Sequence, residues 1–179
     1  MAEKRDTNSV KQFMFLTPLQ ELSFISHTDI RQKQLDCTLQ ILQSSGDTLT
    51  YGWPQIFEIV GAINETQNEN LIRLSFQSLQ FIISDFLALI PSNCLILCVD
   101  TTAKFGSQTQ ELNVSLTAIG LLWNIADYLH SNQNKIQSLL EQNVSKSELN
   151  ETNDQNSIKT ESNAIDSLWM ALFTRLGYK

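Results

Sequence analysis

The chain has 179 residues, of which 42% are hydrophobic, so it is long and apolar enough to form one domain with a substantial core. Its net charge of −7 argues against a broad nucleic-acid surface, which needs clustered Lys and Arg. No segment is apolar over the length of a bilayer crossing, and the N-terminal MAEKRDTNSV lacks the apolar core of a signal peptide. The sequence therefore predicts a soluble, cytoplasmic segment with no nucleic-acid partner.

Start and stop signals divide the chain into helices. Residues 1–15 are expected to be disordered or frayed, and Pro18 suits the first turn of a short helix because its missing N–H is not needed there. Thr28 or Asp29 can cap the next helix, which Gly46 ends. The later signals predict helices over residues 53–64, 71–90, 93–106, 109–131 and 164–176.

The long helices repeat with a gapless period of about 40 residues. When DIRQKQLDCTLQIL from Asp29, ENLIRLSFQSLQFI from Glu69 and TQELNVSLTAIGLL from Thr109 are aligned, apolar residues share two columns. Such a period is typical of HEAT and armadillo units, whose neighbours bury each other's apolar faces. The sequence predicts an all-α, HEAT/armadillo-like α-solenoid of antiparallel helix pairs. The predicted core residues are Leu39, Leu42, Leu79, Ile82, Ile119, Leu122 and Trp123.

The helix predicted over residues 109–131 is apolar nearly all round, so we expect it to be buried between neighbours on both sides. Its Trp123-Asn124 pair invites comparison with armadillo peptide-binding arrays, which present Trp and Asn from one groove. Adjacent residues of a helix point about 100° apart, so this pair fits that groove poorly. A core tryptophan beside an asparagine that bonds to a neighbouring loop is the favoured interpretation.

The composition changes sharply after the third long helix. We expect helical repeats over residues 16–141 and a disordered Asn/Ser-rich linker over residues 142–163, because so polar a stretch cannot offset its ordering entropy. Residues 164–179 (AIDSLWMALFTRLGYK) are amphipathic at first and are predicted to supply a C-terminal helix that continues the solenoid. A helix beyond such a linker suggests a segment of something longer.

Residues that could carry chemistry are sparse. Cys94 and Cys98 have a spacing that could hold a metal, but no further ligands stand near them, so buried free thiols are expected. His27 and His130 lie near predicted helix ends, where capping or surface roles are ordinary. No glycine-rich phosphate loop occurs. We therefore predict no catalytic, cofactor-binding or metal-binding residues and no enzyme, and sequence assigns no partner-binding residues.

Four stretches carry a resemblance beyond periodicity: Asp29–Ile63, Ser78–Pro91, Glu111–Leu129 and Leu168–Gly177. They resemble the Mon-two family of large Golgi and endosome scaffold proteins, which are related to the BIG-type Arf exchange factors. The resemblance implies the helical region downstream of the position of the exchange-factor catalytic domain. It implies a scaffold in endosome-to-Golgi vesicle trafficking and protein transport, cytoplasmic and peripheral to Golgi, trans-Golgi network and endosome membranes.

The partners that the resemblance implies are a Dopey-type protein and an Arf-like GTPase, with membrane association indirect or through other regions of the parent protein. An alternative is a regulatory helical segment of a large Arf guanine-nucleotide exchange factor whose catalytic domain lies elsewhere. A membrane-surface module is a third possibility, which the acidic balance disfavours because anionic lipids attract Lys and Arg clusters.

Overall fold

The computed structural model describes residues 2–64, 67–148 and 163–177. These residues form helices joined by short turns and loops, and no strand occurs among them. The prediction of an all-α helical solenoid is confirmed.

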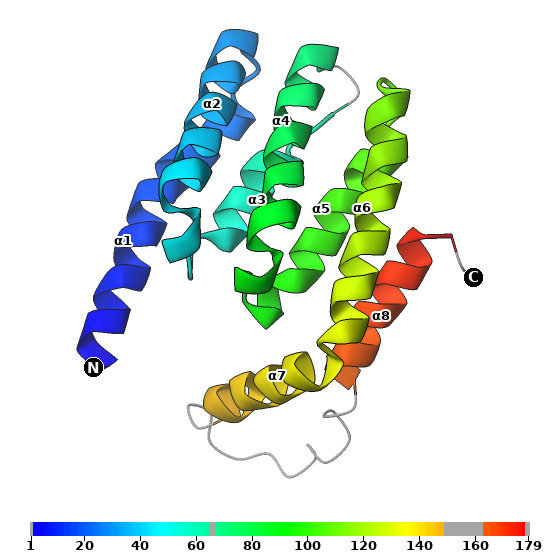
Figure 1. The fold of residues 1–179 in the computed structure, drawn as a ribbon. Helices are drawn as coiled ribbons and strands as arrows, with labels where there is room; N and C mark the ends of the chain where they lie inside the picture. Colours follow the sequence, from blue (N-terminus) through cyan, green and yellow to red (C-terminus); the bar gives the residue numbers. More distant parts are fainter. Residues whose placement is uncertain (1, 65–66, 149–162, 178–179) are drawn as a thin grey trace.

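The helices form two layers, and helices of one layer pack against their neighbours in that layer. The first layer consists of α1 (Ala2–Glu21), α3 (Trp53–Gly61), α5 (Leu95–Ser107) and α8 (Asn163–Arg175). The second layer consists of α2 (Thr28–Ser45), α4 (Glu69–Phe81) and α6 (Leu112–Ser131), which stand side by side in Figure 1. The chain alternates between the layers, so that α3 packs on α4 and α5 packs on α6. Helix α7 (Gln133–Glu148) belongs to neither layer and lies across one end of the stack (Figure 1).

Short turns of tighter or wider helix connect the long elements. The 3-10 turns are Leu22–Phe24, Gly46–Thr48, Leu87–Leu89 and Ser92–Cys94, and a π-helical turn spans Ile82–Phe86. The π-helical turn extends α4 beyond Phe81, so the predicted helix over residues 71–90 is divided into three conformations. Pro91 ends it, as expected, because proline cannot continue a helix.

The core lies between the two layers, and Trp53 is one of its largest fully buried side chains. This side chain is fully buried, and its indole Nε1–H donates to the backbone oxygen of Leu49 at 3.0 Å. Its ring packs against Phe57 and Phe86, with centroid distances of 6.0 and 6.1 Å. The start of α3 is therefore packed against the π-helical turn that follows α4 through one aromatic cluster.

The N-terminal helix is longer than the sequence predicted. Helix α1 begins at Ala2 and contains Pro18 near its end, whereas residues 1–15 were expected to be frayed and Pro18 to start a helix. A side chain in its middle holds it in place: Gln12 Oε1 accepts from the backbone N–H groups of Tyr51 and Gly52 at 2.9 and 3.1 Å. Proline is tolerated late in a helix that tertiary contacts hold, although it removes one backbone donor.

The start of the predicted disordered linker over residues 142–163 is helical in the structure. Helix α7 continues to Glu148, and residues 149–162 lie outside the described residues. The C-terminal helix α8 then packs on α5 and α7.

The buried positions of α2 and α4 keep a period of 40 residues. Helix α6 begins 43 residues after α4 and keeps only part of that period, since Leu42, Ile82 and Leu122 are all buried. The buried positions Arg31, Leu35, Thr38 and Leu42 match Leu71, Ser75, Ser78 and Ile82, each 40 residues later. The next buried set is Val114, Ala118, Leu121 and Ile125, each 43 residues after its counterpart in and just beyond α4. A constant period of 40 is therefore not confirmed: it describes the column of Leu42, Ile82 and Leu122 but not that of Leu39, Leu79 and Ile119.

Candidate interaction surfaces

The structure places the predicted core residues in different environments. Four of them, Leu42, Leu79, Ile82 and Leu122, are buried. Leu39 is half-buried, whereas Ile119 and Trp123 are exposed by 41% and 50%. The prediction that Ile119 and Trp123 belong to the core is wrong, because the shift of three residues puts Leu122, and not Ile119, in the position of Leu79.

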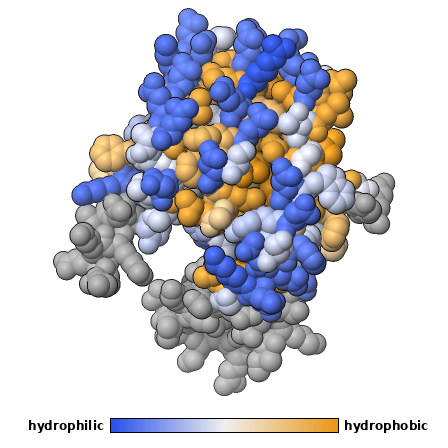
Figure 2. All heavy atoms as spheres, in the orientation of Figure 1, coloured by the Kyte–Doolittle hydropathy of each residue, from blue (hydrophilic) through white to orange (hydrophobic). Residues whose placement is uncertain are grey.

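Helix α6 carries a row of exposed apolar side chains, which we call the α6 stripe. It consists of Leu112, Leu116, Ile119 and Trp123, exposed by 70%, 59%, 41% and 50%. Their spacing of i, i+4, i+7 and i+11 places them on one side of the helix. In Figure 2 hydrophobic atoms gather along the edge of the molecule where α6 lies. The expectation that this helix is buried on both sides is therefore wrong.

The α6 stripe runs beside a second exposed row that is not apolar. This row consists of Asn113, Thr117, Gly120 and Asn124. Trp123 and Asn124 thus both face outward from adjacent rows, and the interpretation of Trp123 as a core residue is wrong. Because the two rows share one helix, they offer matched positions for testing which side of α6 meets another molecule or segment.

A groove of about 530 Å³ opens on the first layer, between α3, α5 and the end of α8. We call it the first-layer groove. Its lining includes Glu58, Asp100, Lys104 and Arg175, so charges of both signs line it. Arg175 Nη2 pairs with Asp100 Oδ1 at 3.1 Å and fixes the end of α8 against α5.

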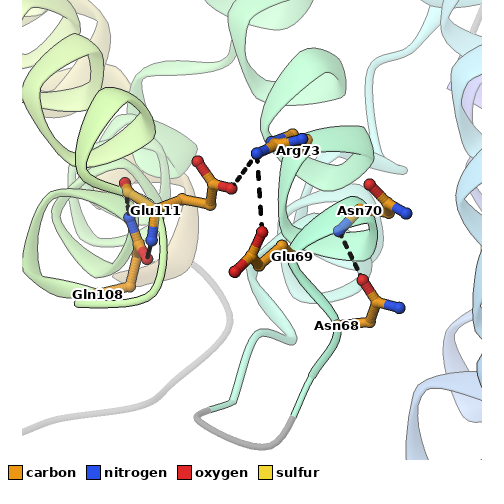
Figure 3. Close-up of polar contacts among 6 residues, drawn as sticks. All are labelled: Asn68, Glu69, Asn70, Arg73, Gln108 and Glu111. Atoms are coloured by element: carbon orange, nitrogen blue, oxygen red, sulfur yellow. Dashed lines mark hydrogen bonds and ion pairs between the residues drawn. The ribbon is translucent and has the colours of Figure 1, made fainter.

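Polar contacts connect the first turns of α4 with the residues just before α6 (Figure 3). Arg73 on α4 pairs with Glu111, and its Nη2 also lies 3.7 Å from Glu69 Oε2. Gln108 binds the backbone of Glu111 in both directions: Oε1 accepts from the N–H at 2.8 Å and Nε2 donates to the oxygen at 2.6 Å. Asn68 caps α4 by accepting from the backbone N–H of Asn70 at 2.9 Å. These contacts fix the start of α4 and the segment before α6 relative to each other.

A buried arginine that the sequence did not single out ties α2 to α3. Arg31 Nη2 donates to the backbone oxygens of Ile59 at 2.6 Å and Ala62 at 3.1 Å, and Nη1 donates to Gln34 Oε1 at 2.5 Å. These carbonyls lie at the C-terminal end of α3, where Ile59 O also accepts from the Ala62 N–H at 3.3 Å and Ala62 O from Gln67 Nε2 at 3.0 Å, so Arg31 adds a charged donor to both. Burial lowers the pKa of Arg31 to about 10, yet a charged donor still suits these carbonyls. Its role is structural, and only the tertiary contact reveals it.

Two of the three cysteines, Cys94 and Cys98, lie in the core. Cys94 and Cys98 are buried free thiols, and burial raises the pKa of both. Thiols of this kind are unreactive because the thiolate is the nucleophile. Within the part of the chain that the structure describes, no three His, Cys, Asp or Glu side chains gather closely enough to hold a metal ion. Among the described helices, none combines the length and the apolar character needed to cross a membrane.

Helical pairs stacked in two layers place the chain in the class of α-solenoids. Residues 84–179 match the family model for the C-terminal region of Mon2 protein, and residues 1–81 match the model described as Mon2/Sec7/BIG1-like, HDS. The chain belongs to the Mon2 family, here a Sec7/BIG-like scaffold region.

Relatives with this family's name support the assignment. The protein MON2 homolog of Drosophila melanogaster is 52% identical over 170 residues, and the human protein MON2 homolog is 42% identical over 182 residues. Each match covers 95% of this chain but 10% of the relative. Monensin-resistant homolog 2 of Caenorhabditis elegans is 33% identical over 67% of the chain. The chain thus spans about a tenth of the length of its first relatives, and no solved structure matches it.

Proposed function

We propose that this chain is a non-catalytic scaffold segment that acts in endosome-to-Golgi membrane trafficking and binds protein partners through its solenoid surface. Membership of the Mon2 family over nearly the whole chain carries the proposal. The first-layer groove, lined by charged side chains of both signs, is a described surface that supports a binding role. The segment would work in the cytoplasm, peripheral to Golgi and endosome membranes.

The partners proposed are a Dopey-type protein and an Arf-like GTPase, and the first-layer groove is the surface proposed for the Dopey-type protein. Lys104 lines this groove and its side chain is exposed, so its charge can be reversed without disturbing the core. Charge reversal in a partner interface lowers the association rate and can cost several kcal/mol where like charges meet.

The experiment compares two charge reversals in the full-length protein. Lys104→Glu is expected to weaken binding of the purified Dopey-type protein, measured by calorimetry, by about tenfold or about 1.4 kcal/mol. Lys135→Glu changes an equally exposed lysine on α7, away from the groove, and is expected to leave binding unchanged. If both variants bind the Dopey-type protein with the wild-type affinity, the first-layer groove is not its binding surface. If the wild-type protein does not bind it, the Dopey-type protein is not a partner of this protein.

A second candidate function is regulation of an Arf guanine-nucleotide exchange factor. The match of residues 1–81 to the Mon2/Sec7/BIG1-like model favours it. The test is nucleotide exchange on Arf and Arf-like GTPases by the full-length protein, with and without this segment. Exchange whose rate changes when the segment is deleted supports regulation, whereas no exchange by the full-length protein supports the scaffold.

A further inference from the structure

Among the described residues, the first layer of the solenoid has one helix more than the second layer. In the first layer α3 packs on α1, α5 packs on α3, and α8 packs on α5. In the second layer α4 packs on α2, and α6 packs on α4. Helix α8 therefore occupies the first-layer place of a further helical pair, and α6 has a described second-layer neighbour on one side, α4.

The buried positions of α4 and α6 show which side of α6 lies away from α4. With the offset of 43 residues, Leu112, Leu116, Ile119 and Trp123 of the α6 stripe correspond to Glu69, Arg73, Phe76 and Gln80 of α4. In α4 this side meets the following helical pair: Arg73 binds Glu111, and the Phe76 ring lies 5.3 Å from that of Phe105 on α5. The α6 stripe is thus on the side of α6 that would meet the pair to which α8 belongs.

The chemistry of the α6 stripe differs from that of its counterpart in α4. Where α4 presents a charged pair and one phenylalanine, α6 presents three aliphatic side chains and a tryptophan. A row at i, i+4, i+7 and i+11 forms a ridge of the kind that packs into the groove of another helix. Exposed apolar rows of this size mark contact surfaces. The expected occupant is therefore an amphipathic helix with an apolar face.

We propose that the α6 stripe is the docking face for the next helix of the second layer, which the same polypeptide supplies after residue 179 in the full-length protein. The first relatives are about ten times longer than this segment, and α8 holds a first-layer place whose second-layer partner would follow it in the chain order of the earlier pairs. The helix would pair with α8 as α6 pairs with α5, and its apolar face would cover Leu116 and Trp123. The α6 stripe is then internal to the solenoid and closed to trafficking partners. This inference does not depend on the proposed trafficking function.

Photocrosslinking in the full-length protein tests the occupant. A photoreactive benzoylphenylalanine replaces Leu116 in one variant and Thr117 in the other, which is exposed on the same helix about 100° away. After irradiation, we expect mass spectrometry to identify crosslinks between position 116 and a segment shortly after residue 179 of the same polypeptide. The variant with the photoreactive residue at position 117 is expected to give far less of this crosslinked product. Crosslinks from position 116 to a second copy, identified by mixing isotopically labelled and unlabelled protein, or to a different protein, would overturn the proposal.

Thiol labelling supplies an independent measurement in folded protein. In the full-length protein, Leu116→Cys is expected to react with maleimide about tenfold slower than Thr117→Cys, because a side chain packed between helices reacts only when the contact opens. Circular dichroism and size-exclusion chromatography establish that both variants are folded before labelling. Equal labelling rates at positions 116 and 117 would show that the α6 stripe is open to solvent and would overturn the proposal.

Discussion

Arg73 on α4 forms an ion pair with Glu111, the residue that directly precedes α6, and so joins two successive helical pairs (Figure 3). The Glu111 side chain is largely buried, whereas that of Arg73 is 57% exposed. Gln108 holds the backbone of Glu111 from the other side. The contact fixes the start of α6 relative to α4.

A double-mutant cycle of Arg73→Met and Glu111→Gln measures this ion pair. We expect a coupling free energy of about 0.2–1 kcal/mol, because the arginine is more than half exposed and water screens the pair. The measurement is the free energy of unfolding from denaturant titration of the four proteins. Glu69→Gln is the comparison, because its carboxylate forms an exposed i, i+4 pair with Arg73 at 3.7 Å, for which we expect a smaller coupling of about 0.3 kcal/mol. A coupling as large for Glu69 as for Glu111 would contradict the assignment of the inter-helix tie.

Alanine substitutions at Leu79 and Ile119 separate a buried position from an exposed one that the gapless repeat had made equivalent. Leu79→Ala in the 179-residue chain is expected to lower the free energy of unfolding by about 2–5 kcal/mol, because it leaves a cavity in the core. Ile119→Ala is expected to cost less than about 1 kcal/mol, because its side chain is 41% exposed. Denaturant unfolding of both variants checks the difference, and similar costs would restore the uniform repeat.

The comparison of these two residues shows what the sequence could predict. The existence of helices α2 to α6 and the column of Leu42 and Ile82 follow from apolar spacing, and the structure retains both, whereas the extent of α1 and the conformation of residues 82–89 differ from the prediction. Between α4 and α6 the chain adds a π-helical turn at Ile82–Phe86 and two 3-10 turns. Such turns change the number of residues per repeat without changing the hydrophobic pattern. A gapless alignment therefore placed Ile119 in the core.

Long-range polar contacts were equally hidden from the sequence. Gln12 binds backbone groups around Tyr51 and Gly52, and Arg31 binds the end of α3. Neither residue has a neighbour in sequence that indicates its partner. The extent of α1 and the burial of an arginine therefore depend on tertiary packing, which overrides local propensity.

Substitution by alanine is expected to change stability in opposite directions at two glycines, Gly46 and Gly120. A Cβ on Gly46 would lie 2.5 Å from Cζ of Phe86, whose ring is held by Trp53 and Phe81. Gly46→Ala is therefore expected to lower the free energy of unfolding by about 1–3 kcal/mol through overpacking. Gly120 lies within α6, and nothing is within 4 Å of its added Cβ. Gly120→Ala is expected to raise stability by about 0.5–1 kcal/mol, because alanine favours the helix. Thermal unfolding of both variants decides; destabilisation by Gly120→Ala or tolerance of Gly46→Ala would contradict the packing.

The buried thiol of Cys98 predicts how stability changes with pH. Burial raises the pKa of Cys98 to about 12, whereas a thiol in the unfolded chain titrates near 9.0. The folded state therefore retains a proton that the unfolded state releases between these two values. The contribution of Cys98 is complete below about pH 9 and declines as the pH rises towards about 12, by about 1.4 kcal/mol for each pH unit.

Guanidinium unfolding at pH 8, 9.5 and 10.5 tests this dependence with Cys98→Ala. The variant starts less stable at pH 8 because it loses buried contacts, but its free energy of unfolding should fall less steeply with pH than that of the wild type. The control is Cys37→Ala, which removes an exposed thiol and should keep the wild-type decline. Other groups that titrate at alkaline pH are present in all three proteins, so the difference in slope isolates Cys98. Parallel pH profiles for Cys98→Ala and the wild type would show that this thiol is hydrated in the folded chain.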